Sequence, residues 1–572
     1  MKQIKYNIEK RSMKMTVKWL GAAFFILHSS FFISSCADYN ETNDFTVQPE
    51  ASYEMPYSEL GAVKSYINRA DYPNMTVDAA VKLAVFNKQA LDHAAAVTNF
   101  DGVAFGNTFM PGTYVSKKGY MNFMALKDAL EHASEIGTEV YGSPIAANEQ
   151  QCDDWFATLT APVEVQVLPI DDKEVDYSTA TEFTGTAISK TPTIVKNYDS
   201  NGNALMIPRR AQVYIVEDFD VDPNGYYTIT FTVKSDAKKD ENLNCTFADS
   251  LIKSGNAAKD FTIRPGVWQT VKVEAVPAAG ATKGYLMIER NLNGALYIRN
   301  VKVSHTPDNH RDQTKAEKND TIRYALNKWC DGLMEANAGR IKSFDLVDKA
   351  LDTNKEIEPG ILDLKHSAEK IFWQDYLEDA THTGSELYAA TVSKVASAAF
   401  EKHGGNPAEL KFFIGETGLE DQKRLESLKY WMNKWEANGA KIDGINAELN
   451  LVYSEDATMQ AASEATLNTL LDNLAKTGKL IRLSNFDIKY QDAEGNNVGA
   501  QYITTAQRQK LADFYAFVIK AYMTKIPKEK QAGLCKGNMA DTSAPVGLWE
   551  VVSNDWVRTA TYKAFCDALG GK

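Results

Sequence analysis

The spacing of apolar residues predicts helices that alternate with short strands in the first part of the chain. Apolar side chains over residues 76–97 recur every three or four positions, which is typical of a helix with one buried face. A short apolar run at 103–105 predicts a buried strand. Residues 120–135 again have helical spacing, and 139–141 predict a second strand. Strands that alternate with helices favour a parallel sheet or barrel.

The pattern changes near Ala161, where apolar and polar residues begin to alternate with the period of a strand. Residues 226–233, 269–273 and 295–303 are the clearest cases, and turns rich in glycine, proline and asparagine separate them. This texture predicts an antiparallel β-sandwich over residues 161–306.

Helical spacing returns at 322–336, a strand is predicted at 344–347, and the alternation continues to the C-terminus. The simplest organisation is one α/β domain, residues 59–160 and 307–572, with the sandwich inserted in a loop. Surface loops tolerate such insertions.

The N-terminal segment has the order of a secretory signal. Cations precede an apolar run over 19–33, and Ser34-Ser35-Cys36 follows, which resembles the bacterial lipobox. We expect residues 1–36 to be the signal, with lipid on Cys36, and 37–58 to be a polar linker whose acidic residues resemble the export tag of Bacteroidetes surface lipoproteins. An ordinary signal peptide or a membrane anchor is the alternative, although the run is short for a spanning helix. The expected location is the outer membrane or cell surface, with the periplasmic face as the alternative.

Composition and charge narrow the classes of molecule that the protein is expected to bind. The 572 residues carry a net charge of −13, which argues against a nucleic-acid partner because a phosphate-binding surface must be positive. A surface that binds neutral polysaccharide does not need to be positive. Besides Cys36, five cysteines remain, an odd number without a CxxC spacing. We expect buried or free thiols, no metal site and no cofactor.

Four short segments carry a resemblance to a known family. Residues 344–350, Phe-Asp-Leu-Val-Asp-Lys-Ala, are similar to Trp-Asp-Val-Val-Asn-Glu-Ala, and 483–488, Leu-Ser-Asn-Phe-Asp-Ile, to Ile-Thr-Glu-Leu-Asp-Ile. Residues 441–446 are similar to Pro-Ile-Asp-Gly-Ile-Gly and 107–110 to Asn-Glu-Met-Lys. Taken together, in their order along the chain, the four segments resemble glycoside hydrolase family 10, the endo-β-1,4-xylanases. The resemblance implies a TIM (β/α)8 barrel interrupted by the all-β sandwich.

The predicted sandwich resembles the carbohydrate-binding modules that interrupt xylanase barrels of gut Bacteroidetes after the third strand. Here the insertion follows residues 141–144, the equivalent position. The resemblance gives Trp268 a packing role in the module core. Tyr214, Tyr226 and Tyr285 are candidates for stacking on sugar rings, with packing in the core as the alternative.

The resemblance places Lys349 at the acid/base position and Asn485 at the nucleophile position. Retaining glycosidases need two carboxyl groups roughly 5–5.5 Å apart. An ammonium cannot replace the acid that protonates a leaving oxygen, and an amide cannot form the glycosyl-enzyme bond. The same alignment puts Ser143, Asn148 and Asn450 at histidine positions of the family. The predicted cleft comprises Asn107, Ser143, Asn148, Asp348, Lys349, Glu448, Asn450, Asn485 and Asp487.

Relocated carboxylates are the alternative. Acidic residues near predicted strand ends are Asp345, Asp348, Glu416, Glu448 and Asp487. A relocated pair would join Asp348 to Asp487 or to Glu448. The simpler interpretation gives Asp345 and Asp487 structural roles, and pairs Lys349 with Asp348 as a buried ion pair.

Three functional hypotheses follow from the sequence. The first is a lipid-anchored protein, catalytically inactive, that binds xylan or a related β-glycan through the inserted carbohydrate-binding module, with the remodelled barrel cleft as a second candidate surface. Its expected setting is beside the outer-membrane glycan-uptake machinery. The second is an active endo-β-1,4-xylanase with relocated carboxylates. The third is a structural or adhesion protein in which the barrel is only a scaffold.

Overall fold

The computed structural model describes residues 56–254, 261–289 and 293–572, without the side chains of 107 and 108. The predicted signal, the lipidation site at Cys36 and nearly all of the linker lie outside the described residues. Within the described residues, every helix is too short or too polar to cross a membrane.

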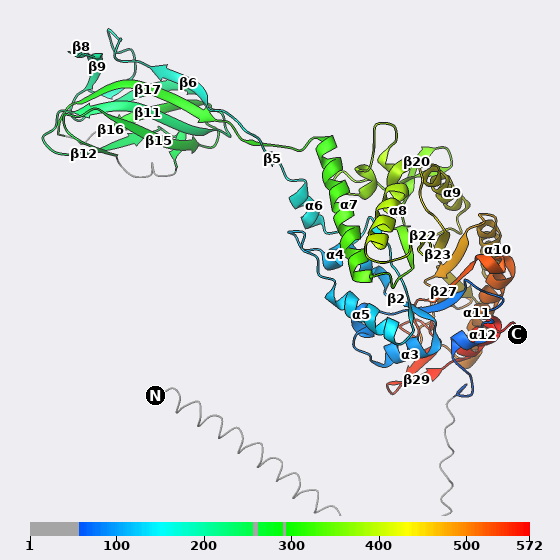
Figure 1. Cartoon of the computed structure of the whole chain (residues 1–572). Coiled ribbons are helices and arrows are strands. Elements are labelled where there is room, and N and C mark those ends of the chain that lie inside the picture. The colour runs from blue at the N-terminus through cyan, green and yellow to red at the C-terminus, as the bar shows by residue number, and fades with distance from the viewer. Residues whose placement is uncertain (1–55, 255–260, 290–292) are drawn as a thin grey trace, which may run out of the picture. The chain divides into compact units, whose positions relative to one another are not determined.

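A parallel sheet forms the centre of the α/β part (Figure 1). Its strand order is β3-β2-β1-β27-β25-β23-β22-β19-β4. β4 pairs with β19, and Gly142, which follows β3, forms a parallel bridge with Phe344 of β19, so the sheet closes on itself. A Cβ atom at Gly142 would collide with the Phe344 ring, which explains glycine at this closing point. The strands are β1 Thr76–Ala80, β2 Gly102–Ala104, β3 Glu139–Tyr141, β4 Ala146–Ala147, β19 Ser343–Asp348, β22 Lys411–Thr417, β23 Gly444–Glu448, β25 Leu480–Ser484 and β27 Gln531–Lys536.

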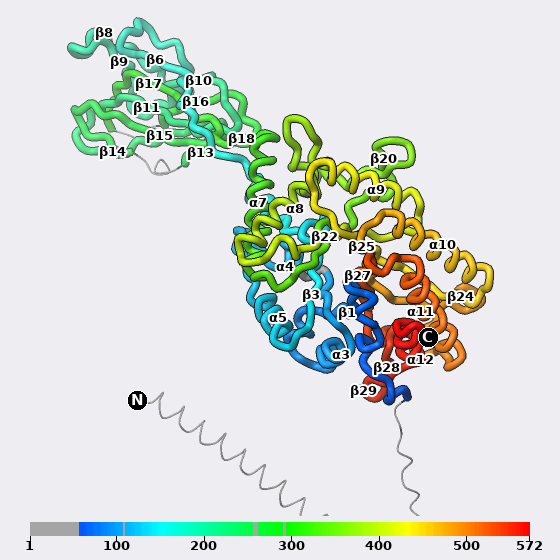
Figure 2. Tube along the Cα trace, turned by 45° about the vertical axis from the view of Figure 1, so that its right-hand side comes forward, coloured from blue at the N-terminus to red at the C-terminus, as the bar shows by residue number. Residues whose placement is uncertain are grey.

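Helices follow the strands and surround the barrel (Figure 2). Three of them begin with a capping box, in which a threonine and the Glu or Gln three residues later satisfy each other's backbone N–H groups. These boxes start α7, α8 and α11 at Thr314, Thr383 and Thr504. The main helices are α3 Leu91–Asn99, α5 Met124–Glu135, α7 Lys315–Asn337, α8 Gly384–Lys402, α9 Gln422–Ala437, α10 Ala457–Ala475, α11 Thr505–Lys525 and α12 Ala560–Leu569.

The helix predicted over 76–97 is wrong. Its first part is strand β1, and only Leu83–Phe86 and α3 are helical. The middle of β1 is buried on both faces, so its sequence Thr-Val-Asp-Ala-Ala lacks the alternation by which half-exposed strands are identified. The strands predicted at 103–105, 139–141 and 344–347 and the helix at 322–336 are confirmed, with shifts at their ends. The helix predicted from residue 120 begins at Met124.

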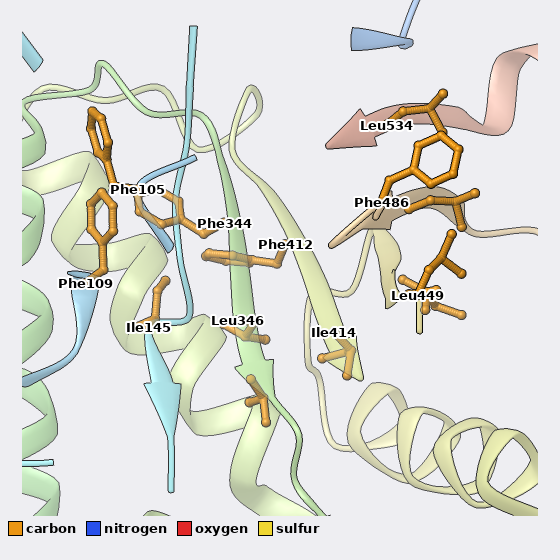
Figure 3. Close-up of a cluster of buried hydrophobic side chains, with 14 of the residues drawn as sticks. Phe105, Phe109, Ile145, Phe344, Leu346, Phe412, Ile414, Leu449, Phe486 and Leu534 are labelled. Carbon is orange, nitrogen blue, oxygen red and sulfur yellow. The ribbon is translucent and has the colours of Figure 1, made fainter. Parts of the chain in front are cut away.

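Large aromatic and aliphatic side chains fill the space inside the barrel and between the barrel and its helices. Phe344 of β19 and Phe412 of β22 lie next to each other there, and Phe105 and Phe109 pack nearby (Figure 3). The rings of Phe109 and Phe344 meet edge to face at 6.5 Å between centroids. This packing fixes the strands whose ends carry the polar residues described below.

Residues between β5 and β18 form two antiparallel sheets with their own hydrophobic core (Figure 1). The five-stranded sheet has the order β14-β12-β16-β10-β7, and the other runs β13-β15-β11-β17-β9-β8 with β6 also on β17. The strands predicted at 226–233, 269–273 and 295–303 are confirmed as β11, β15 and β17. Bounds are β5 Val163–Glu164, β6 Ile170–Val175, β7 Ala187–Ser189, β8 Thr193–Asp199, β9 Gly202–Ile207, β10 Gln212–Asp220, β11 Tyr226–Ser235, β12 Glu241–Thr246, β13 Leu251–Lys253, β14 Phe261–Ile263, β15 Gln269–Pro277, β16 Lys283–Glu289, β17 Leu296–Thr306 and β18 His310–Arg311.

Candidate functional site

A cavity of about 660 Å³ opens where the barrel strands end. Parallel barrels carry their sites at this edge, because the loops after the strands converge there. Five of the nine predicted cleft residues line the cavity: Ser143, Asp348, Lys349, Glu448 and Asn485.

The other four predicted residues are placed differently. Asn450 is exposed, and its amide donates to the Thr417 hydroxyl at 2.9 Å. The amide atoms of Asn148 are buried and have no hydrogen-bond partner among the described residues. Asn107 lies in the short 3-10 helix Gly106–Phe109, and its side chain is outside the described part of the structure. Asp487 is held by neighbours outside the lining, as described below.

Lys349 forms the central ion pair of the cavity. Its ammonium lies 2.6 Å from Glu448 Oε2 and 4.0 Å from Asp348 Oδ2. Burial alone would lower the pKa of Lys349, but the charges of Asp348 and Glu448 outweigh burial, and the pKa is raised. The ammonium therefore stays charged at neutral pH, and its close partner is the Glu448 carboxylate.

Asp348 and Asp345 are buried acids on β19. Burial, reinforced by the neighbouring Asp345, raises the pKa of Asp348 to about 8, against the opposing effect of Lys349. Burial raises the pKa of Asp345 to about 6, although Tyr141 donates to it at 2.7 Å and Asn446 at 2.9 Å. Asp348 is thus mostly protonated at pH 7, and the cavity holds fewer negative charges than its sequence indicates.

Asn485 and Lys349 share an unusual backbone conformation. Their φ angles are 50° and 49°, in the left-handed region that costs most residues energy but that asparagine tolerates. The Asn485 amide donates to the Leu449 carbonyl at 3.2 Å. Such conformations are commonly found at functional sites, where surrounding structure holds them. Lys349 directly follows the last residue of β19, and Asn485 directly follows the last residue of β25.

Asp487 is held by ion-pair and hydrogen-bond partners outside the cavity lining. It forms an ion pair with the fully buried Lys536 and accepts hydrogen bonds from the backbone and side-chain nitrogens of Asn538. Burial lowers the pKa of Lys536 despite this partner. Glu416 is likewise engaged, by Arg424 at 2.8 Å. Of the two relocated pairs considered, only Asp348 with Glu448 lies in the cavity lining.

A buried ion pair inside the barrel was not predicted from the sequence. Arg482 of β25 pairs with Asp78 of β1 at 2.5 Å, and both side chains are almost fully buried. The guanidinium also lies over the Tyr141 ring at 3.9 Å. A charged residue in the middle of each of two apolar strands was the signal that could have revealed this pair.

The cysteines behave as the sequence predicts, since no disulfide bond joins any of the five described cysteines. Four of these thiols are buried, and Cys152 is partly exposed. In the described part of the chain, no group of three or more histidine, cysteine or acidic side chains is arranged to hold a metal ion.

The sequence profile of glycosyl hydrolase family 10 matches residues 301–542. No curated protein matches the sequence significantly.

Three solved structures are similar in fold. A GH10 endoxylanase retrieved from a sugarcane soil metagenome has 10% identity, covers 89% of this chain and 100% of its own, and has a TM-score of 0.50. An endo-1,4-beta-xylanase of Penicillium canescens has 13% identity, coverage of 89% and 98%, and a TM-score of 0.48. Xylanase B of Clostridium stercorarium F9 has 12% identity, coverage of 89% and 100%, and a TM-score of 0.49. The α/β part of the chain therefore has the TIM-barrel fold of glycosyl hydrolase family 10.

Proposed function

We propose that the protein is a surface lipoprotein that binds xylan or a related β-glycan without cleaving it. The observation that carries the proposal is the ion pair between Lys349 and Glu448 at the cavity. It occupies the strand end where the family resemblance places the catalytic acid. The proposal includes the lipid on Cys36 and a role beside outer-membrane glycan-uptake machinery.

Chemistry at the two strand ends supports binding over hydrolysis. Lys349 has a raised pKa, so it cannot deliver a proton to a leaving oxygen at neutral pH. Asn485 offers an amide where a glycosyl-enzyme bond needs a carboxylate. The cavity nevertheless has a volume of about 660 Å³ and a polar lining that includes Ser143 and Ser484. Such groups can hydrogen-bond sugar hydroxyls.

Two measurements on the purified full chain test the proposal. Isothermal titration with soluble xylan, mixed-linkage β-glucan and mannan should give saturable binding to at least one of them. Incubation with the same polysaccharides should release no reducing sugar above a boiled control. Failure to bind any of the three would overturn the proposal, and glycan-independent capture of a protein partner would then favour the adhesion hypothesis.

The lipid anchor has its own test. Cells that express the wild type should incorporate labelled palmitate into the protein and retain it in the membrane fraction. The Cys36→Ser variant should incorporate none. Incorporation into this variant would contradict an anchor at Cys36, and absence of label from both would favour an ordinary signal peptide.

A second candidate is hydrolysis by Asp348 with Glu448. These two carboxyl groups flank the same ammonium, and a protonated Asp348 has the state that a general acid needs. Reducing-sugar release by the wild type, abolished in Asp348→Asn and in Glu448→Gln but kept in the exposed Asp128→Asn, would establish it. Release that survives both cavity variants would exclude this pair.

A further inference from the structure

The outer face of the five-stranded sheet carries a second candidate binding surface. Strand register places Gln212, Glu289 and Asn244 in one row across β10, β16 and β12. Tyr214, Met287 and Thr246 form the next row. Because side chains two residues apart share a face of a strand, the two rows and Tyr285 lie on the same outer face.

A shallow cavity of about 580 Å³ lies on this face. Its floor includes Met287 and Glu289, and its wall is the turn from Phe247 to Lys253. The turn is fixed to the sheet because the Ser250 hydroxyl accepts a hydrogen bond from the Tyr285 backbone N–H at 3.2 Å. We call this cavity, together with Tyr214 and Tyr285, the sandwich groove.

The polar groups of the sandwich groove form a chain of opposite charges. Lys253 donates to the Asn244 amide oxygen at 3.2 Å, and the Asn244 amide donates to Glu289 at 3.4 Å. The Thr246 hydroxyl has no hydrogen-bond partner among the described residues. The exposed Asp249 on the wall adds a second acid, so the groove holds two acids and one cation. The contacts of Asn244 are long enough for ligand hydroxyls to compete for them.

Tyr214 and Tyr285 supply the apolar part of the groove. Their ring centroids are 5.7 Å apart with an angle of 59° between the planes. Neither tyrosine belongs to the hydrophobic core between the sheets, and both are partly exposed. Sugar rings have apolar C–H faces, and tyrosine can contact such a face while its hydroxyl remains hydrated.

Three aromatic residues on the side of the other sheet, Trp268, Tyr198 and Tyr297, are already engaged. Trp268 donates to Asp199 at 3.0 Å, and the Arg299 guanidinium lies over its ring at 4.4 Å. Tyr198 and Tyr297 stack on each other at 4.3 Å. Trp268 therefore packs, as the sequence predicts, but on the outer face and not in the core between the sheets.

We propose that the sandwich groove binds a segment of a neutral β-glycan chain through Tyr214, Tyr285, Asn244 and Glu289. This inference rests on the proposed glycan-binding function and assigns it to one surface. Acidic sugars are disfavoured because Glu289 lies on the groove floor and Asp249 on its wall, against a single lysine, Lys253, in the lining. Hydroxyl-rich neutral sugars match a surface that offers both hydrogen-bond donors and acceptors beside two partly exposed tyrosine rings.

Isothermal titration of full-length variants with xylohexaose and with a glucuronic-acid-bearing xylan fragment tests the inference. Tyr285→Ala should weaken binding of the neutral chain by about tenfold, and the isosteric Glu289→Gln by about threefold, as expected for losing a ring contact and a charged hydrogen-bond partner. Tyr324→Ala is the matched control, because Tyr324 is an exposed tyrosine on α7, outside the linings of the barrel cavity and of the sandwich groove. Thermal unfolding checks that each variant is folded.

The outcomes separate the inference from the proposed function. Wild-type binding that all groove variants retain would overturn the inference and leave the proposed function standing. Loss of binding in Lys349→Ala with retention in Tyr285→Ala and Glu289→Gln would place the site in the barrel cavity. A stronger preference for the acidic fragment would overturn the assignment to neutral chains. Absence of wild-type binding to every glycan would overturn both proposals.

Discussion

The barrel cavity and the sandwich groove have similar volumes, but their polar groups differ in how closely they are paired with one another. In the barrel, Lys349 is paired with Glu448 at 2.6 Å, and buried acids beside it are held partly protonated. In the groove, the contacts of Asn244 are longer and two tyrosine rings remain partly exposed. Volume alone therefore says little about ligand binding. What matters is whether polar groups already satisfy one another or remain available to a ligand.

The largest expected effect comes from the ion pair inside the barrel. Asp78→Asn removes the partner of Arg482 and leaves a buried guanidinium without a compensating charge. We expect the free energy of unfolding to fall by roughly 3–5 kcal/mol in urea denaturation. Asp128→Asn, at an exposed position of α5, is the control and should change it by less than about 0.5 kcal/mol.

The double variant Asp78→Leu, Arg482→Met sharpens this result. Replacing both charges with apolar groups should recover much of the loss, because the cost comes from an unpaired buried charge. Equal losses in the single and double variants would show that the pair contributes through packing, and the contrast with the groove would weaken.

A smaller effect should appear in the pH dependence of stability. The pKa of Asp348 is raised to about 8 in the folded protein, from about 3.9 in an unfolded chain. The folded state therefore binds more protons between these values, and this contribution to stability, complete below about pH 4, is lost as pH rises through 8. Asp345, with a pKa of about 6, acts in the same direction.

Urea denaturation at pH 5 and pH 9 measures this effect. The wild type should lose more stability over this interval than Asp348→Asn, by roughly 2–4 kcal/mol. Groups that do not interact with Asp348 cancel in the difference between the two proteins, whereas Asp345, Lys349 and Glu448 are electrostatically coupled to it. Equal losses in the wild type and in Asp348→Asn would mean that Asp348 is ionised in the folded state. The cavity would then carry one more negative charge at neutral pH.

The smallest effect concerns Trp268. Trp268→Phe keeps an aromatic ring over Arg299 but removes the hydrogen bond to Asp199. We expect a loss of about 1 kcal/mol in the free energy of unfolding and no change in glycan affinity. Val267→Ala, at the exposed neighbouring position, is the control. A loss of affinity in Trp268→Phe would move the binding surface to the other sheet.

Much of the fold could be predicted because its strands and helices have distinct periods. Half-exposed strands such as β11 and β15 alternate polar and apolar residues, and α7 has a long helical stripe. β1 could not be recognised in this way, because a strand buried on both faces has no alternation. Order along the chain nevertheless placed Lys349 and Asn485 at strand ends, where the structure has them.

The candidate site was less predictable, because it depends on contacts between distant residues. Lys349 was expected to pair with Asp348, yet its shorter contact is with Glu448, about a hundred residues later. Nothing in the local sequence distinguishes Asp487, which Lys536 holds, from Glu448, which faces the cavity. Tertiary geometry decides which acid is available.

The chain leaves the barrel and returns to it through neighbouring strands. β5 and β18 pair antiparallel, with Glu164 opposite His310, so the two crossings are only a strand spacing apart. A direct splice from residue 164 to residue 310 would thus need almost no bridging peptide. We therefore expect a chain in which residue 164 is joined directly to residue 310 to form the barrel without the all-β region.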